Sequence, residues 1–307
     1  MGDTELSLNI VVCVKQVPDT KRITGEAMKE DGTVNRAALP AIFNPEDLNA
    51  LESALEIRER VGGTVTAITM GPPSACEVLR ECYYRGADRC VLLTDRRAAA
   101  SDTLATSYIL SCAVRKIEPD LVLCGRQAID GDTAQVGPQL AEKLGFTLVT
   151  YLEELLDVVD NGQDKSIRLR RNVGNGWEDV TTALPALVTV LDTANAPRPC
   201  AIKRIMKFKK ARSEGELAIA IKAAHGDESS ELPRQCDALK PKGLLIESWN
   251  LDDIQADLEW CGMSGSPTKV NRIQSVVLTG GEYHEIAPTD EGMAGLVAEL
   301  IKEHTVG

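Results

Sequence analysis

LVLCGRQAIDGDTAQVGPQLAEKLG, residues 121 to 145, is the stretch of sequence that decides the fold. The apolar run at 121–124 passes through an acidic loop into a helical pattern whose buried face is Val136, Leu140 and Leu144. A continuous apolar run is typical of a strand that is covered on both faces, as in a parallel sheet. The stretch therefore predicts a strand, a loop and a helix that packs back on the sheet.

The same alternation extends through the first half of the chain. Strands are expected at 8–14, 64–70, 90–94 and 121–124, and helices at 45–61, 74–85, 102–117 and up to 144. Strands that alternate with helix-length segments predict an α/β fold, with a mostly parallel sheet whose strands are joined by crossover helices. From residue 148 the pattern changes to strand-like pieces at 148–158, 166–173, 178–183 and 186–191. These pieces predict an antiparallel edge or meander.

The last third of the chain is irregular in composition. A short helix is expected at 251–261, capped by Asn250, and a final helix at 290–303. These pieces are too scattered to form an obvious second core. We therefore expect an α/β domain at residues 1–200 and, at residues 201–307, an extended C-terminal arm that borrows a partner's surface. A tail packed on its own domain is the alternative.

Composition and charge narrow the function. The chain has 46 acidic and 34 basic residues and a net charge of -12, which opposes a polyanionic partner, so nucleic acid is not expected. No apolar stretch approaches the roughly 18 residues that span a membrane. The sequence also lacks the basic segment and long apolar segment of a secretory signal. We therefore expect a cytoplasmic protein that does not span a membrane.

Cysteine and histidine usage argues against a metal site. The nine cysteines are an odd number and none forms a CxxC pair, so they are interpreted as small buried hydrophobes in a reducing compartment. There are only three histidines, all late in the chain. Neither a zinc site nor a histidine-assisted nucleophile is supported.

Ligands of open α/β sheets bind outside the carboxyl ends of the strands, where loops converge. That rule selects CVKQVPDT (13–20), FNPEDLNALE (43–52), TMGPPSA (69–75) and CGRQAIDGDTAQVG (124–137). The chain has neither a GxGxxG nor a GxxxxGK[ST] fingerprint at these places, so a nucleotide site here would be of another kind.

The last of these loops suits a phosphate group. A helix N-terminus offers unpaired N–H groups and partial positive charge, and Gly131 would let a phosphate approach the backbone closely. Asp130 and Asp132 would repel it, unless one caps the helix and the other faces a ribose or water. Pro138 either occupies the first helical position or kinks the first turns. A glycine loop with an aspartate cap and no ligand is the alternative.

The other segments allow a structural and a functional interpretation. Asn44, Pro45 and Asp47 are first interpreted as a helix start, with a cap, a first-turn proline and a first-turn carboxylate. The segment 101–103 is either a helix cap or a ligand contact. Lys15, which follows a buried strand, either steadies an anion or lies in solvent.

Taken together, these segments resemble the β subunit of electron transfer flavoproteins. The matching pieces are VVCVKQVPDT (11–20), NPEDLNALESAL (44–55), TMGPP (69–73), RGADR (85–89), SDTLATS (101–107), CGRQAIDGDTAQVGP (124–138) and LPALVTV (184–190). They cover most of residues 8–200 in the family's order, so the match is specific. The resemblance implies a Rossmann-like α/β domain that pairs with an α subunit holding a FAD.

The resemblance also implies a nucleotide on this chain, which is AMP in the simple electron carriers of the family and a second FAD in the electron-bifurcating ones. Carried over by motif, the nucleotide contacts are Cys13, Asn44, Pro45, Glu46, Asp47, Met70, Arg126, Gln127, Ala128, Ile129, Asp130, Gly131, Asp132, Thr133, Ala134, Gln135, Val136 and Gly137. The pieces VKQVPDT, TMGPP and SDTLATS are more similar to the bifurcating branch, which favours FAD. The flavin ring would then lie near Val17, Pro18, Thr94, Asp102 and Thr103.

In a bifurcating complex, electrons from NADH would reach this FAD. One would go through the α-subunit flavin to an acyl-CoA dehydrogenase-type or quinone-linked partner, and the other to ferredoxin or flavodoxin. The chemistry would belong to the flavin and the protein would tune it, so we expect an electron carrier with no catalytic side chain. The alternatives are a non-bifurcating β subunit with a structural AMP, an ATP-using adenylating enzyme on a related fold, and a binding module with no ligand.

Partner contacts are expected in the C-terminal region. By itself the basic run KRIMKFKKAR (203–212) is either a solvated face or a docking segment, in which apolar side chains anchor and charge steers. The segment from Arg198 to Lys210 is similar to the family's recognition loop for dehydrogenases, with Ile202 where an apolar anchor is expected. SGSPTKV (264–270) belongs to the family's tail and is expected to lie against the α subunit.

Overall fold

The computed structural model describes residues 7–19, 39–160, 165–225, 231–268 and 286–302. Thr20, residues 269–270 and Glu303 belong to segments named above but lie outside the described residues.

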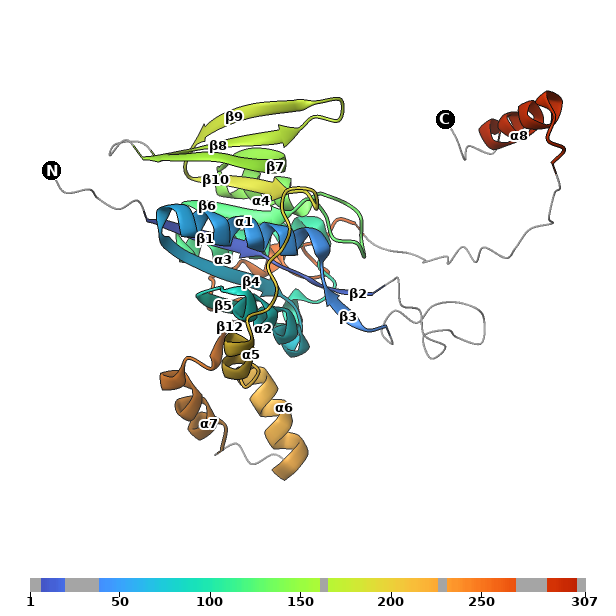
Figure 1. Ribbon diagram of the computed structural model, residues 1–307. Coiled ribbons are helices and arrows are strands. Elements are labelled where there is room, and N and C mark those ends of the chain that lie inside the picture. Colours follow the sequence, from blue (N-terminus) through green and yellow to red (C-terminus); the bar gives the residue numbers. More distant parts are fainter. Residues whose placement is uncertain (1–6, 20–38, 161–164, 226–230, 269–285, 303–307) are drawn as a thin grey trace.

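A ten-stranded sheet runs through the molecule in the order β11-β12-β5-β4-β1-β6-β10-β7-β8-β9 (Figure 1). Its strands are β1 (Leu8–Cys13), β4 (Gly63–Met70), β5 (Arg89–Leu93), β6 (Leu121–Gly125), β7 (Thr147–Asp160), β8 (Lys165–Asn172), β9 (Trp177–Ala183), β10 (Ala186–Val190), β11 (Arg212–Ser213) and β12 (Leu245–Trp249). Neighbouring strands from β11 to β7 all run parallel. A separate two-stranded antiparallel sheet pairs β2 (Gln16–Pro18) with β3 (Ala41–Phe43). The predicted α/β fold with a mostly parallel sheet is confirmed.

Helices cover both faces of the parallel strands. Those on the two faces are α1 (Pro45–Val61) and α2 (Cys76–Arg85), and α3 (Thr103–Ile117) and α4 (Val136–Leu144). The further described helices are α5 (Ile202–Phe208), α6 (Glu214–His225), α7 (Glu231–Leu239) and α8 (Asp290–Lys302). Ile10 and Val12 of β1 are buried with α1 and α2, whereas Val11 and Cys13 are buried with α3 and α4 on the other face. Because successive strand residues face opposite sides, both sets must be apolar, which explains the continuous apolar runs.

The antiparallel part is smaller than the sequence predicts. β7, β8 and β9 pair antiparallel, as expected. The prediction that 186–191 joins this meander is wrong, because β10 lies between β6 and β7 and runs parallel to both. All five residues of β10 are buried, which is the pattern of a central strand and not of an edge.

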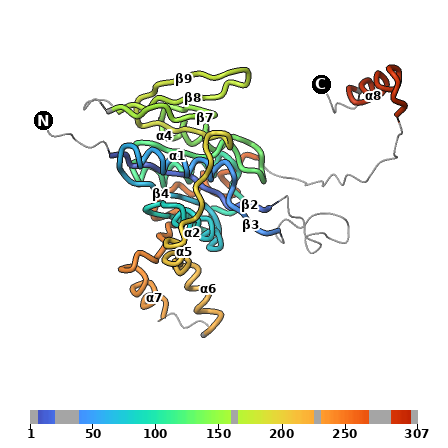
Figure 2. Tube along the Cα trace, in the orientation of Figure 1, coloured from blue at the N-terminus to red at the C-terminus, as the bar shows by residue number. Residues whose placement is uncertain are grey.

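The chain leaves β10 and crosses α1 to reach α5, as Figure 2 shows. Asn195 Nδ2 donates to Asn49 O (3.0 Å) and to Ser53 Oγ (2.9 Å) of α1. The guanidinium of Arg198 forms an ion pair with the buried Glu52 (2.9 Å). The connection is therefore fixed to α1, and it carries the start of the predicted recognition loop.

Part of the C-terminal region packs on its own domain, which corrects the expectation of an arm for that part. β12 pairs in parallel with β5, and β11 pairs with β12. Ile246 and Trp249 of β12 are buried against the sheet, so this apolar pattern completes an edge of the main core. By contrast, α8 lies apart from the body of the molecule, with its side chains mostly exposed (Figure 1).

The short helix predicted at 251–261 is wrong. This segment forms turns and a single 3₁₀ turn at Leu258–Trp260. Asn250 Oδ1 accepts from the N–H groups of Asp252 (2.8 Å) and Asp253 (2.9 Å), which closes a local turn instead of capping a helix. None of the described helices has the length and apolar character needed to cross a membrane.

Candidate functional site

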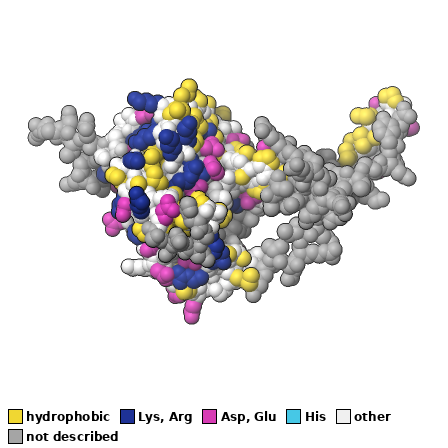
Figure 3. Space-filling view, turned by 90° about the horizontal axis from the view of Figure 1, so that it is seen from below, with side chains coloured by type: hydrophobic (Ala, Val, Ile, Leu, Met, Phe, Trp, Pro, Cys, Tyr) yellow, Lys and Arg dark blue, Asp and Glu magenta, His cyan; other side chains and the backbone are white. Residues whose placement is uncertain are grey.

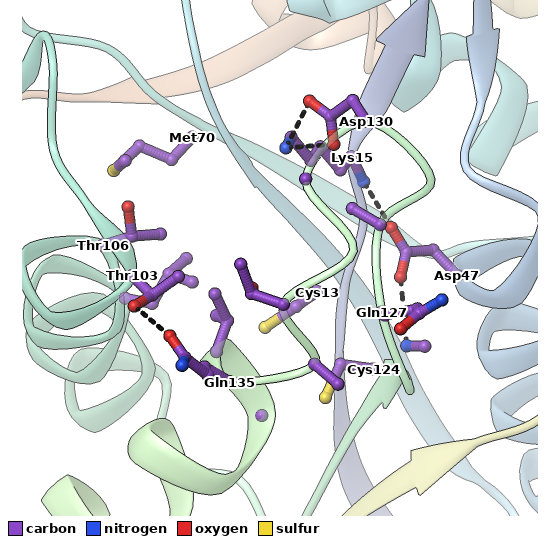
Figure 4. Close-up of a pocket in the computed structure, with 18 of the residues that line it drawn as sticks. Cys13, Lys15, Asp47, Met70, Thr103, Thr106, Cys124, Gln127, Asp130 and Gln135 are labelled. Carbon is purple, nitrogen blue, oxygen red and sulfur yellow. Dashed lines mark hydrogen bonds and ion pairs between the residues drawn. The ribbon is translucent and has the colours of Figure 1, made fainter. Parts of the chain in front are cut away.

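A cavity of about 410 Å³ opens at the carboxyl ends of β1, β4 and β6. Its walls are the strand ends, the start of α3 and the loop that leads from β6 into α4 (Figure 4). The lining residues are Cys13, Val14, Lys15, Asp47, Ile68, Thr69, Met70, Ser101, Asp102, Thr103, Thr106, Leu110, Cys124, Gly125, Arg126, Gln127, Ala128, Asp130, Gly131, Asp132, Thr133, Ala134, Gln135, Val136 and Gly137. This is the edge at which open α/β sheets bind ligands.

Many of the residues predicted to contact the nucleotide or flavin meet at this cavity. Those that line it are Cys13, Asp47, Met70, Asp102, Thr103 and all residues from Arg126 to Gly137 except Ile129. Asn44, Pro45, Glu46 and Ile129 lie outside the lining, at or beside the first turn of α1. Val17 and Pro18 belong to β2, and Thr94 lines a separate cavity of about 10 Å³ beside Trp249.

The first turn of α1 does not cap itself as predicted. Asn44 precedes α1, but its side chain makes no capping hydrogen bond. Instead, Asn44 Nδ2 donates to Gln127 O (2.9 Å) and Asn44 Oδ1 accepts from the N–H of Ile129 (3.2 Å). The side chain is fully buried, so these bonds satisfy polar atoms that water cannot reach. The sequence interpretation of Asn44 as a cap is therefore corrected.

Asp47 joins two neighbouring strands at the point where the cavity opens. Its Oδ2 accepts from the N–H of Lys15 (2.9 Å), just after β1, and its Oδ1 accepts from the N–H of Gly125 (3.0 Å), at the end of β6. The carboxyl group is buried, and burial raises the pKa of Asp47 to about 7, against the opposing effect of a hydrogen bond with the Asn44 side chain, of these two main-chain hydrogen bonds and of the Lys15 charge.

Glu46 holds the next part of the loop. Its Oε2 accepts from the N–H of Gln127 (2.7 Å), and its Oε1 forms an ion pair with Arg126 Nη2 (2.8 Å). Burial raises the pKa of Glu46, against the lowering effect of these two partners. The first turn of α1 thus contacts the loop from β6 to α4 through three polar side chains.

The loop itself reaches α4 by turns with left-handed backbone. Asp132 has φ of 50° and Ala134 has φ of 52°. α4 begins at Val136 after Gln135, so the prediction that an aspartate caps this helix is wrong. Pro138 lies at the third helical position, where its missing N–H is one of those that a helix start leaves unpaired.

The glycines of this region differ in what their backbone faces. A Cβ on Gly131 would meet nothing within 4 Å, so the fold leaves open space at the tip of the loop. A Cβ on Gly137 would lie 2.8 Å from Thr189 Cγ2 and 2.9 Å from Cys124 Sγ. Packing of α4 on the sheet therefore requires glycine at 137, whereas the space at Gly131 is available to a ligand.

Asp130 and Asp132 each form hydrogen bonds with another residue of the cavity lining. Lys15 Nζ lies 2.7 Å from both carboxylate oxygens of Asp130, which joins the end of β1 to the loop (Figure 4). Gln127 Nε2 donates to Asp132 Oδ1 (3.2 Å). Arg126 Nε is buried and makes no hydrogen bond within the described residues.

The start of α3 forms the opposite wall. Asp102 caps this helix, since its Oδ1 accepts from the N–H groups of Leu104 (2.9 Å) and Ala105 (3.0 Å). Thr103 Oγ1 donates to Gln135 Oε1 (2.8 Å), which ties the wall to the loop (Figure 4). The two interpretations of segment 101–103 are compatible, because Asp102 both caps α3 and lines the cavity.

Sequence reasoning missed several lining residues. Thr106 lies one helical turn after Thr103 and faces the same space, a spacing that could have identified it. Ile68 and Leu110 line the apolar part of the cavity, but in the sequence they look like any core residue.

The cavity floor carries two thiols, from Cys13 and Cys124, which are register partners on β1 and β6. Burial, with the nearby Asp47 charge, raises the pKa of Cys13 to about 12, and burial also raises the pKa of Cys124 well above its usual range. Both stay protonated at neutral pH and are poor nucleophiles. Across the described residues, no group of cysteine, histidine or acidic side chains could hold a metal ion.

The predicted recognition segment contains α5 (Ile202–Phe208). Figure 3 shows basic, acidic and hydrophobic side chains interspersed on the face of the molecule that is seen from below. Ile202 is 79% exposed and Met206 is 59% exposed. Phe208 instead is buried and stacks on Tyr83, with ring centroids 4.4 Å apart. The apolar residues of the run therefore divide between the protein's own core and an exposed surface.

Comparisons with known proteins identify the family. A model of the electron transfer flavoprotein domain matches residues 31–218. The electron transfer flavoprotein subunit beta of Clostridium acetobutylicum is 38% identical, with 97% of this chain and all of that protein covered. Protein FixA of Azorhizobium caulinodans is 39% identical (96% and 94% covered). The caffeyl-CoA reductase-Etf complex subunit CarD of Acetobacterium woodii is 38% identical (97% and 100% covered).

These matches extend over nearly the whole chain and include the loop and strand ends that surround the cavity. The family model points to the same family as the resemblance in the motifs. The parallel sheet is the fold that this resemblance implied. The chain therefore belongs to the electron transfer flavoprotein family, in the group of its β subunits.

Proposed function

We propose that this chain is the β subunit of a heterodimeric electron transfer flavoprotein that binds FAD in the cavity and works in flavin-based electron bifurcation. Electrons from NADH would pass to an acyl-CoA dehydrogenase-type or quinone-linked partner, and to ferredoxin or flavodoxin. The partner α subunit would hold the other FAD, and the complex would act in the cytoplasm.

The extent of the cavity is the observation that carries the choice of FAD. A polar part is formed by the loop at 126–135 and the start of α4. The lining of the same cavity also includes the apolar side chains of Ile68, Met70 and Leu110. A mononucleotide such as AMP needs only the polar part, whereas a dinucleotide with a flat, largely apolar ring system has a use for both.

The polar groups of the cavity fit a phosphate-bearing ligand. The start of α4 supplies main-chain N–H groups and positive partial charge, and the open space at Gly131 allows close approach. The side chain of Arg126, which lines the cavity and is 36% exposed, adds positive charge and further donors. Asp130 and Asp132 are each engaged by a local donor, Lys15 or Gln127, which reduces their repulsion of an anion.

Bound FAD would supply the electron-transfer chemistry, and the protein would position it and tune its potential. Thr103 and Thr106 offer hydroxyl groups on one wall, and the apolar wall excludes water from the ring. Because the cavity thiols are buried and protonated, they are assigned no chemical step. No catalytic side chain is proposed.

Partner docking is assigned to the segment from Arg198 to Lys210. The exposed Ile202 and Met206 of α5 would provide apolar contacts, surrounded by lysines of the same run. The name of the Acetobacterium woodii relative places that protein in a complex with a caffeyl-CoA reductase, which supports an acyl-CoA-linked partner for this chain. In this proposal, residues 1–200 hold the nucleotide and residues 201–307 make most of the partner contacts.

The test is the cofactor content of the chain co-expressed with its α subunit. Acid release followed by chromatography should give two FAD and no AMP per heterodimer. One FAD and one AMP would instead show a non-bifurcating carrier. Reduction of the complex by NADH, followed by absorbance, should then require the second FAD.

A further inference from the structure

Side chains at the first turn of α1 contact the main chain of the loop from β6 to α4 (residues 126–135), which we call the nucleotide loop. Asp47 accepts from the N–H groups of Lys15 and Gly125, at the splayed ends of β1 and β6. Glu46 accepts from the N–H of Gln127. Asn44 contacts Gln127 O and the N–H of Ile129. The base of the loop is thereby held at several successive points, and the loop residues 126–128 and 130–135 line the cavity.

We propose that Asn44, Glu46 and Asp47 are positioning residues, which act on the nucleotide through the loop and not by touching it. This inference rests on the proposed nucleotide-binding function of the cavity. It replaces, for these residues, the direct contact that their place in the family motif implied.

Location supports this assignment. Neither Asn44 nor Glu46 lines the cavity, and their polar atoms are directed to the loop. Asp47 lines the cavity, but both of its oxygens already accept main-chain N–H groups. A carboxylate would also repel a phosphate or a ring carbonyl at this place, so direct contact with such a group is disfavoured.

The chemistry of Asp47 is specific to a carboxylate. Its two oxygens face two N–H donors, and an asparagine of the same shape would place its NH₂ group against one of them. One main-chain N–H would then be buried without an acceptor, which costs free energy. The loop would move to reduce that cost. Because Gly125 is the last residue of β6, that movement would be transmitted directly to the loop.

A matched control lies at the other end of the same two strands. Asp120, just before β6, accepts from the N–H of Asn9 in β1 (2.8 Å). This bond likewise joins β1 to β6 by a carboxylate and a main-chain N–H, but at the edge away from the cavity. Asp120→Asn should weaken this bond and the ion pair of Asp120 with Lys165 (3.3 Å) without altering the nucleotide loop.

The experiment compares Asp47→Asn with Asp120→Asn in the full-length chain at about pH 8. Hydrogen exchange of the unliganded chain, followed by mass spectrometry, reports on residues 126–135. Calorimetric titration with AMP and with FAD reports on affinity. We expect Asp47→Asn to exchange at least about tenfold faster in the loop and to bind nucleotide at least about tenfold more weakly, equivalent to about 1.4 kcal/mol. Asp120→Asn should change neither.

Unchanged loop exchange in Asp47→Asn would overturn the proposal, as would faster exchange with unchanged affinity or equal loss of affinity in both variants. If Asp47→Asn does not fold, Asn44→Ala removes two loop contacts and a hydrogen bond to Asp47 without removing a charged group, and the same outcomes decide. If the wild-type chain binds neither nucleotide but the exchange difference is present, the proposed function fails while the bracing of the loop by α1 stands.

Discussion

Gly125→Ala tests whether the contact between α1 and the end of β6 is as close as the structure shows. A Cβ at this position would lie 2.5 Å from Asp47 Oδ1, 2.7 Å from Asp47 N and 2.8 Å from Glu46 C. Two of these atoms belong to the main chain of α1, so no side-chain rotation can relieve the overlap. Either the helix or the end of β6 must move.

The expected cost has two parts. Overpacking of a well-packed site typically costs about 1–3 kcal/mol. Movement of the strand end also weakens the hydrogen bond from Gly125 N–H to the Asp47 carboxylate, and a bond to a charged group contributes about 1.5–3 kcal/mol. The variant should therefore lose about 3–6 kcal/mol, a large fraction of the stability of a typical domain, about 5–15 kcal/mol.

Urea denaturation of the full-length chain without nucleotide, followed by circular dichroism, measures this loss. With a denaturant slope of about 3 kcal/mol/M, the midpoint should fall by about 1–2 M. The matched control is Gly131→Ala, whose Cβ would meet open space, and its midpoint should stay within the equivalent of about 1 kcal/mol of wild type. The reasoning is refuted if Gly125→Ala also stays within about 1 kcal/mol, or if both variants lose the same stability.

Three further predictions follow from the site and the docking segment. Burial raises the pKa of Asp47 to about 7 in the folded chain, against about 4 in the unfolded chain. The contribution of Asp47 to the unfolding free energy is therefore full below about pH 4 and is lost as the pH rises through 7, and the loss is about 4 kcal/mol at most. Asp47→Asn lacks this loss, so its unfolding free energy relative to wild type should improve between about pH 5 and pH 8; parallel pH profiles would contradict the assignment. Gly131→Trp should fill the cavity and reduce the FAD retained by the purified heterodimer while leaving the urea midpoint unchanged, and full FAD content would count against the site. Phe208→Ala should lower the unfolding free energy by about 3–5 kcal/mol, whereas Ile202→Ala should change it by no more than about 0.5 kcal/mol yet slow electron transfer to the dehydrogenase partner; an unchanged rate would remove Ile202 from the docking surface.

The parallel part of the fold could be predicted from the sequence because its signals are local. The helix expected at 45–61 has those bounds in the structure, since a proline start, an apolar face and a following glycine act over short distances. The place of β10 could not be predicted in this way. Its run reads like a neighbour of the meander, but strand order depends on contacts between distant segments, and here full burial places it beside β6.

In the site, too, local sequence signals predicted some features, whereas others depend on contacts between distant segments. Position at the carboxyl ends of strands and a glycine-containing loop identified the region of the cavity. The partner of each polar residue could not be read in the same way. A helix-start pattern such as Asn44 and Pro45 predicts a cap, whereas the structure directs Asn44 to a loop more than 80 residues later in the chain. The competing acceptors and donors exist only after the sheet has formed.

The hydrogen-bond partners of the acidic residues bear directly on the proposed function. In the sequence, aspartates and glutamates beside the loop proposed to bind phosphate look unfavourable for an anionic ligand. In the structure, Glu46 and Asp47 accept main-chain N–H groups of the strand ends and loop, and Asp130 contacts Lys15. Their oxygens are therefore used as hydrogen-bond acceptors that fix the shape of the cavity, and their repulsion of a ligand is reduced by the donors they already hold. A net acidic chain can in this way shape a site for an anionic nucleotide, and such a site depends more on the geometry of its main-chain donors than on the number of its basic side chains.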